Sequence, residues 1–283
     1  SDFYFDWEAV KSVQKFFNIL FNSVNFMKSY APTGMKPQSK FDTTKLIPSA
    51  DGKLFEQSSK LATIDKWILS RANTLIEECE KYNKNYVGFK SMNAIQEFIV
   101  NDFSRTYIKL TRERTSPNYI GKDKETVFAI IDYVLRKTIL LIAPAAPFSA
   151  EKIYQMLGKT DGKESIHLCD FPTADKKLID SELERDMKIA MDVVESINSI
   201  RQEKNLRLRW PLKKATISGE KPVVSAITRL KSVVCELANV KDIAFGAVSL
   251  EIDIKPNYKV FGPAFGKDAK LVADLLAKAD ARE

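Results

Sequence analysis

The sequence predicts a mainly α-helical protein in which a helical bundle is followed by a small mixed α/β domain. Over the first part of the 283-residue chain, apolar residues recur every three or four positions, which is the spacing of a buried helix face. Toward the other end, two short segments alternate apolar and polar residues as strands do, with a helical pattern between them. We therefore expect an N-terminal helix and polar connecting loop over 1–60, the helical bundle over 61–180 and the mixed α/β domain over 181–283.

Two helices separated by a polar loop are expected to open the chain. The first covers residues 6–30, where the apolar positions form one wide face. The second begins at Asp65, whose side chain can cap the first turn. Five residues that interrupt regular structure lie between them: Pro32, Gly34, Pro37, Pro48 and Gly52. A connection of this kind is typical of a functional loop or a linker.

Three further helices complete the predicted bundle. One covers residues 89–111, and the next covers 125–143. The second of these is apolar almost all round, which predicts a central position. It is expected to end at Pro144, because proline cannot continue a helix. Ser149 is then expected to cap a shorter helix that ends at Gly158.

The mixed domain is predicted to combine two helices with two strands. A helix over 181–204 comes first, and a strand with one basic face follows at 206–210. A second helix is predicted over 223–237 and a second strand over 248–254. Helices and strands that alternate in so short a segment indicate a small α/β or α+β domain.

The composition is that of a globular protein with a basic excess. Charged residues make up 29% of the chain and the formal net charge is +7. The longest apolar stretch, 138–148, is too short to span a membrane and contains two prolines, so we expect no membrane partner. The cysteines Cys79, Cys169 and Cys235 are far apart and odd in number, which disfavours a disulfide framework. We therefore expect a cytoplasmic protein.

No group of residues predicts catalysis or metal binding. The single histidine, His167, cannot form a site of several histidines and is expected to be structural. The chain contains neither a Gly-x-Ser-x-Gly nucleophile motif nor the Gly-x-Gly-x-x-Gly loop of dinucleotide-binding proteins. We predict no catalytic residue, no metal ligand and no cofactor in this chain.

One polar stripe on the helix over 89–111 is a candidate nucleic-acid surface. Residues three and four apart share a helix face, which places Asn101, Arg105, Lys109 and Arg112 together. Three cations and an amide on one face can bind a phosphate backbone and a base edge. The alternative is an ordinary solvated face, and the pattern alone favours neither.

A second basic cluster lies between Arg201 and Lys214, where six cations accompany one acid. Its secondary candidate residues for nucleic-acid binding are Arg201, Arg207, Arg209 and Trp210. The segment 175–195 directly before it contains seven acids and four bases. We favour neutralisation between these two segments inside the protein over direct contact with nucleic acid.

Several blocks of the sequence, in order, resemble the anticodon-binding helical domain of the class I aminoacyl-tRNA synthetases for isoleucine, valine, leucine and methionine. These blocks are DKWILSR (65–71), AIQEFIVND (94–102), YIKLTRER (107–114), LIAPAAPF (141–148) and SIHLCDFP (165–172). The resemblance adds Arg114, at the end of the third block, to the candidate tRNA-binding residues. The family often has a tryptophan where this chain has Thr106.

Two more blocks are similar to the isoleucyl branch of that family. RQEKNLRLRWPL (201–212) resembles isoleucyl enzymes in general, and KPNYKVFGPAFGK (255–267) resembles their archaeal and eukaryotic members. The chain has neither the His-Ile-Gly-His nor the Lys-Met-Ser-Lys-Ser signature that binds ATP in this class. The resemblance therefore implies a C-terminal fragment that lacks the catalytic chemistry.

The resemblance implies a function in tRNA recognition. The parent enzyme would use ATP to attach isoleucine to tRNA, and this fragment would bind the anticodon stem-loop and contact the parent's catalytic domain. The fragment alone would form no isoleucyl-adenylate. The alternative is a protein-interaction or scaffold domain in which the positive charge serves only solubility.

Overall fold

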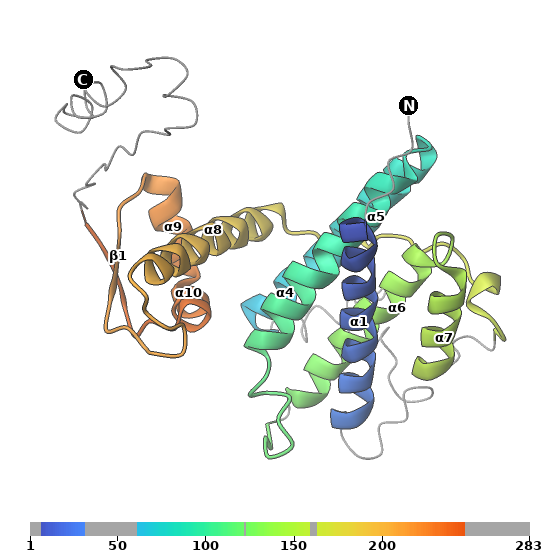
Figure 1. The fold of residues 1–283 in the computed structure, drawn as a ribbon, viewed down its shortest axis with the longest axis horizontal. Helices are drawn as coiled ribbons and strands as arrows, with labels where there is room; N and C mark the ends of the chain where they lie inside the picture. The colour runs from blue at the N-terminus through green and yellow to red at the C-terminus, as the bar shows by residue number, and fades with distance from the viewer. Residues whose placement is uncertain (1–6, 32–60, 122, 159–162, 247–283) are drawn as a thin grey trace, which may run out of the picture.

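The computed structural model describes residues 7–31, 61–121, 123–158 and 163–246. It has a helical bundle at one end and a small domain of helices and two short strands at the other (Figure 1). The predicted fold class, mainly helical with a bundle before a mixed domain, is confirmed. The predicted connecting loop within 1–60 and the predicted strand at 248–254 lie outside the described residues.

Within the described residues, the bundle is built from six helical segments. They are α1 (Trp7–Tyr30), α4 (Thr63–Lys84), α5 (Gly88–Glu97), the π-helix η1 (Phe98–Ile108), α6 (Lys124–Ile142) and α7 (Pro147–Leu157). The predicted central helix is α6, which buries thirteen of its side chains. Phe26 of α1 stacks on Phe128 of α6 with ring centroids 6.1 Å apart, so these two helices share one core.

The predicted third helix changes its hydrogen-bond pattern midway. It is α-helical through α5 and π-helical through η1, whose buried residues are Phe98, Ile99, Phe103, Thr106 and Tyr107. The Thr106 hydroxyl donates to the carbonyl of Asn101, five residues earlier, at 2.9 Å. The wider turn of a π-helix therefore decides which side chains of this segment face the core.

The helix starts differ from two predictions. Ala62, not Asp65, is the N-cap of α4, and Asp65 lies in the first turn, where its carboxylate accepts from the Ala62 N–H at 3.2 Å. Ser149 lies inside α7, which begins with Pro147 at its first position. Gly158 ends α7 as predicted, with a φ of 87° that favours glycine.

The remaining elements form the connection and the second domain. They are two 3-10 turns, η2 (Ile166–Leu168) and η3 (Lys176–Leu178), then α8 (Ser181–Glu203), β1 (Ala215–Ile217), α9 (Lys221–Arg229), α10 (Lys231–Ala238) and β2 (Ile243–Phe245). The strands are parallel, with Ala215 opposite Ile243. The single helix predicted over 223–237 is two helices that meet at Leu230. The strand predicted at 206–210 is a loop.

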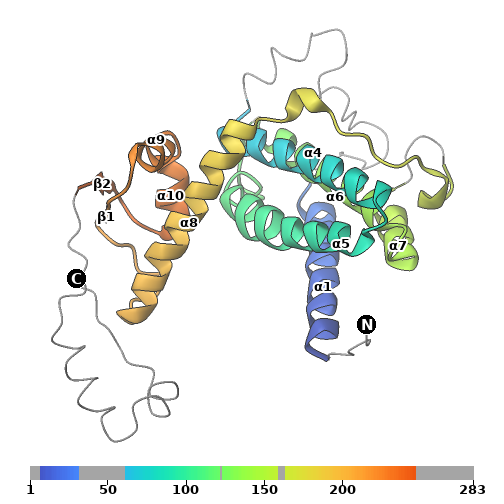
Figure 2. The same cartoon turned by 90° about the horizontal axis from the view of Figure 1, so that it is seen from above.

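Helix α8 connects the two parts of the molecule. Its N-terminal end lies beside α4, and its length runs along α9 and α10 (Figure 2). Within the described residues, no helix is long and apolar enough to cross a membrane. The same residues contain no cluster of three or more side chains able to hold a metal ion.

Candidate nucleic-acid interface

A groove of about 960 Å³ lies between η1 and α8. Three members of the predicted polar stripe line its η1 side: Asn101, Arg105 and Lys109. Arg185 and Lys188 line the opposite side from α8, and all five side chains are exposed. A ligand in the groove would therefore meet cations from two separate elements of the protein.

The η1 side of the groove is ordered by its own contacts. Arg105 Nη1 donates at 3.1 Å to Oδ1 of Asn101, four residues earlier. Lys109 Nζ donates to the carbonyl of Leu237, in α10, at 3.4 Å. Ile99, Phe103 and Tyr107, on the other face of this segment, are fully buried. This segment therefore has a polar face on the groove and an apolar face in the core.

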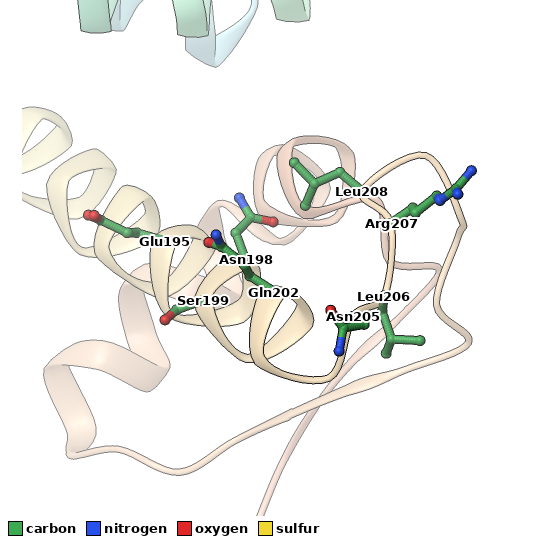
Figure 3. A pocket seen from close by; sticks show the side chains of 8 residues that line it. All are labelled: Glu195, Asn198, Ser199, Gln202, Asn205, Leu206, Arg207 and Leu208. Carbon is green, nitrogen blue, oxygen red and sulfur yellow. The ribbon is translucent and has the colours of Figure 1, made fainter.

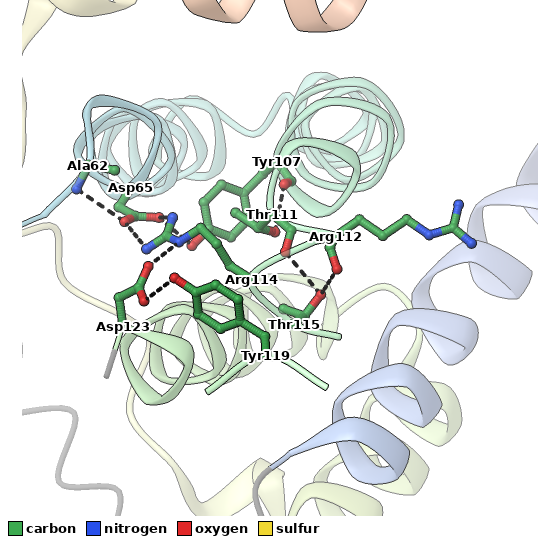
Figure 4. A network of polar contacts seen from close by, with 9 residues as sticks. All are labelled: Ala62, Asp65, Tyr107, Thr111, Arg112, Arg114, Thr115, Tyr119 and Asp123. Carbon is green, nitrogen blue, oxygen red and sulfur yellow. Dashed lines mark hydrogen bonds and ion pairs between the residues drawn. The ribbon is translucent and has the colours of Figure 1, made fainter. Parts of the chain in front are cut away.

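Arg112, the fourth member of the predicted stripe, does not reach the groove. The helix has ended before it, and residues 111–115 form turns. Its side chain is exposed and points away from the polar network around Arg114 (Figure 4). An α-helical spacing placed Arg112 on the stripe, but the π-helical turn and the helix end separate it from Asn101 and Arg105.

The floor of the groove is a set of ion pairs centred on Arg71 of α4. Arg71 Nε lies 3.1 Å from Asp102 Oδ2, and its Nη1 lies 3.3 Å from Glu184 Oε2. The Glu184 carboxylate also accepts from Thr74 Oγ1 at 2.8 Å and from the Ser70 hydroxyl. These contacts place one cation against two carboxylates, and they connect α4, η1 and α8.

Burial raises the pKa of two acids near Arg71, Asp102 in the floor and Glu78 of α4. Loss of water raises the pKa of Asp102 to about 6, and the adjacent Arg71 guanidinium opposes that shift. Burial also raises the pKa of Glu78, with Arg71 again acting in the opposite direction. Asp102 is therefore sensitive to mildly acidic pH.

Arg114 lies in a separate buried network at the start of α4 (Figure 4). Its Nη1 and Nη2 donate to the two oxygens of Asp65 at 3.0 and 2.8 Å, and its Nε donates to Asp123 at 2.6 Å. Tyr107 donates to the same Asp65 carboxylate at 2.9 Å. Complete burial raises the pKa of the Tyr107 phenol, and the negative charge of Asp65 raises it further. All three guanidinium nitrogens are engaged, so the structure gives Arg114 a role in holding the fold.

Arg201 is also buried, and it contacts no acid among the described residues. Its Nη1 donates to the carbonyls of Ala238 and Asn239 at 3.1 and 3.4 Å. Its Nη2 donates to Arg207 and Leu208 at 3.0 and 3.2 Å, and to the Trp210 carbonyl. The carbonyls of the predicted strand are thus bonded to one arginine instead of a neighbouring strand, which explains why this segment is a loop.

The other secondary candidates, Arg207, Arg209 and Trp210, are exposed on that loop. The Arg207 guanidinium lies 5.8 Å from the centre of the Trp210 ring, within cation–π range. Neither Arg207 nor Arg209 forms an ion pair in the part of the chain that the structure describes. The expected neutralisation by segment 175–195 is therefore absent there.

Three acids of that segment form ion pairs with other residues. Glu182 and Asp186 pair with Arg229 of α9, and Glu184 pairs with Arg71. The sequence interpretation also missed Arg185 and Lys188, because it counted them only as part of an acidic balance. Their spacing of three residues puts them on one face of α8, which is the signal that identifies them.

One protein family has a model that matches the part of the chain containing this groove. The family model of the anticodon-binding domain of tRNA ligase matches residues 65–217, which is more than half of the chain. The chain belongs to this family. The matched residues include α4 from Asp65 onward, η1 and α8, the three elements that form the groove and its floor.

Curated relatives support the same family. The isoleucine-tRNA ligase of Methanocaldococcus jannaschii is 37% identical over 289 residues, covering 100% of this chain and 26% of that protein. The ligase of Pyrococcus abyssi is 36% identical over 275 residues, covering 95% of this chain and 24% of its own length. The ligase of Methanocella arvoryzae is 34% identical, with 99% and 25% covered. The chain spans about a quarter of the length of these relatives, and the predicted resemblance to isoleucyl enzymes is confirmed.

Proposed function

We propose that this chain binds the anticodon arm of a tRNA as part of an isoleucine-tRNA ligase, and that the groove between η1 and α8 contacts the RNA. The observation that carries the proposal is the pairing of exposed cations across the groove, Arg105 and Lys109 on one side and Arg185 and Lys188 on the other. Cations on both sides can contact phosphates of one RNA strand that lies between them.

The remaining lining supports RNA over a purely anionic ligand. Three exposed acids, Glu97, Asp192 and Glu195, also line the groove, together with the amides of Asn101 and Asn198. Carboxylates repel phosphate, but they accept hydrogen bonds from the amino groups of bases, and amides do both. Such a mixture suits phosphate contacts that position a strand and base contacts that select it.

The wider assignments belong to the proposal. The parent ligase would supply the catalytic domain and use ATP and isoleucine, and this chain would contribute no catalytic residue. Three well-separated cysteines support a cytoplasmic protein. The alternative of a protein-interaction or scaffold domain predicts tRNA binding that is weak and insensitive to salt.

The test is titration of the 283-residue chain with tRNA transcripts over about 50 to 200 mM salt. Alanine at Arg105 or Lys188 should weaken binding to every tRNA and reduce the slope of log affinity against log salt by about 0.7 per lost phosphate contact. Asn101→Ala should weaken the transcript with an isoleucine anticodon more than one with a swapped anticodon.

Two variants serve as controls. Arg112→Ala removes an exposed cation that lies outside the groove, and Lys152→Ala removes one from α7. Neither should change the slope. Equal slopes for Arg105→Ala, Lys188→Ala and both controls would overturn the groove as the contact surface.

A further inference from the structure

The loop that follows α8, residues 204–214, presents a strongly basic surface. It contains no acid, and all of its cations are exposed: Lys204, Arg207, Arg209, Lys213 and Lys214. Within the described residues, none of these cations forms an ion pair. The adjacent acids offset little of the charge, since Asp242 pairs with Lys231 at 2.6 Å and Glu203 is a single exposed carboxylate. The surface therefore suits an anionic ligand.

The main chain of this loop is held in place by contacts from outside it. The buried Arg201 donates to the carbonyls of Arg207 and Leu208 at 3.0 and 3.2 Å, and Asn239 Nδ2 donates to the same Leu208 carbonyl at 2.9 Å. Within the loop, the Trp210 N–H donates to the Arg207 carbonyl at 3.0 Å. A loop that is already ordered lowers the entropy cost of binding, because it does not have to become ordered when the ligand arrives.

Trp210 is the aromatic residue of this surface, and it is 50% exposed. The Arg207 guanidinium lies 5.8 Å from the centre of the indole ring. The Arg207 side chain projects outward from the loop, away from α8 (Figure 3). The faces of unpaired RNA bases stack on aromatic side chains and on guanidinium planes. This pair therefore brings a stacking surface and a phosphate-binding group within reach of one nucleotide.

We propose that Trp210 stacks on an unpaired RNA base while Arg207, Arg209 and Lys213 contact the phosphates beside that base. A cationic surface that carries an exposed aromatic ring is the combination by which proteins bind single-stranded nucleic acid. Stacking tolerates every base, so this surface holds the strand and does not select its sequence. The inference rests on the proposed function, since it gives the same RNA a second contact.

Helix α8 connects this surface with the groove. Lys188 lines the groove, and the helix ends at Glu203, directly before the loop. At about 1.5 Å per residue, the helix between these two residues is about 22 Å long. Six or seven nucleotides stacked at about 3.4 Å each span that length. One RNA strand is therefore long enough to contact both surfaces.

The experiment measures the tryptophan fluorescence of the 283-residue chain in a Trp7→Phe background. Trp67 is 1% exposed, so quenching by added RNA reports on Trp210. Ten-nucleotide oligo(A) should quench the emission, because a base in contact with the indole removes its excited state. A ten-base-pair RNA duplex should quench far less, since its bases are stacked on one another and paired.

Variants at position 210 separate stacking from a general apolar contact. In fluorescence anisotropy with labelled oligo(A), Trp210→Leu should weaken binding about tenfold, and Trp210→Phe should retain most of the affinity. A protein partner bound through apolar contact would tolerate leucine. Equal quenching by oligo(A) and the duplex, or unchanged affinity in Trp210→Leu, would overturn the stacking site and favour a protein partner for this loop.

Variants of the cations test the phosphate contacts. Arg209→Ala and Lys213→Ala should each reduce the slope of log affinity for oligo(A) against log salt by about 0.7. Lys152→Ala, which removes an exposed cation from α7, is the matched control and should leave the slope unchanged. Equal slopes in all three variants would remove the phosphate contacts from the proposal.

These results are independent of the groove variants tested with tRNA. If Arg105→Ala flattens the salt slope with tRNA and neither oligo(A) nor tRNA quenches Trp210, the proposed function stands and the stacking site is wrong. If Trp210 is quenched and Arg105→Ala leaves the tRNA slope unchanged, the groove assignment fails and the loop after α8 is the RNA surface.

Discussion

Arg71 and Glu184 form the ion pair that fixes the start of α8 to the bundle, with Arg71 Nη1 3.3 Å from Glu184 Oε2. The same guanidinium holds Asp102 of η1. One side chain of α4 therefore sets the positions of both sides of the groove. Since binding across a groove depends on the spacing of its sides, loss of this pair should affect the proposed RNA contact as well as stability.

Titration of Asp102 should lower the free energy of unfolding as pH rises. Its pKa is raised from 3.8 to about 6 in the folded chain, so between these values the folded state binds a proton that the unfolded state does not. This stabilisation is complete below about pH 4 and is lost as pH rises through 6. At about 1.4 kcal/mol per pKa unit the effect is at most about 3 kcal/mol.

The comparison that isolates this effect is Asp102→Asn against wild type in urea denaturation at several pH values. As pH rises from about 4 to 6.5, the free energy of unfolding of the variant should increase relative to that of wild type. A difference that stays constant across this range would show that Asp102 titrates normally.

Asp65→Asn should destabilise the chain strongly. The carboxylate is completely buried and accepts from Arg114, Tyr107 and the Ala62 N–H. Its neutralisation leaves a largely buried guanidinium with reduced compensation, at a cost of about 3 kcal/mol. The matched change Asp123→Asn removes a half-exposed partner of the same arginine and should cost about 1 kcal/mol or less. Similar losses for the two variants in urea denaturation would contradict the assigned burial.

Arg114→Ala should affect stability and not RNA binding, whereas Lys188→Ala should affect RNA binding and not stability. Arg114 is engaged by two carboxylates, so its loss should lower the denaturation midpoint and leave the salt dependence of tRNA binding unchanged. Lys188 is exposed in the groove, so its loss should change the salt slope and leave the midpoint unchanged. A flattened slope for Arg114→Ala, measured where the variant is folded, would return this residue to the RNA surface.

The helices were predictable because their apolar spacing is a local property of the sequence. Residues 125–143 read as a central helix, and α6 is that helix. The groove was predictable only in part, since Asn101, Arg105 and Lys109 share a segment, whereas Arg185 and Lys188 are brought opposite them by the tertiary fold. The alternation at 206–210 resembled a strand, but no sequence pattern shows that Arg201 takes up the carbonyls a partner strand would need.

Arg201→Lys should loosen the loop that carries Trp210. A lysine ammonium cannot reproduce the planar fork that reaches carbonyls on two sides, so several acceptors would lose their donor. The readout is acrylamide quenching of tryptophan fluorescence in a Trp7→Phe background. Of the two remaining tryptophans, Trp67 is 1% exposed and Trp210 is 50% exposed, so the quenching reports mainly on the loop.

Quenching should increase in Arg201→Lys relative to the Trp7→Phe parent, and Arg209→Lys should leave it unchanged. Helical circular dichroism at 222 nm should be the same in all three chains, because α8 and α10 keep their own hydrogen bonds. Unaltered quenching in Arg201→Lys would mean that the main-chain bonds of the loop suffice without the arginine.

The number of residues in the π-helical segment η1 determines how side chains after it are oriented toward both the core and the groove. Deletion of one residue between Phe98 and Ile108 would rotate everything after it by up to about 100° relative to what precedes it. Tyr107 would then turn away from Asp65 at the same time as Lys109 turned out of the groove. A substitution in η1 can alter one surface and spare the other, whereas a change of length there alters both together. Tolerance to mutation in this segment is therefore tolerance to exchange of side chains, not to insertion or deletion.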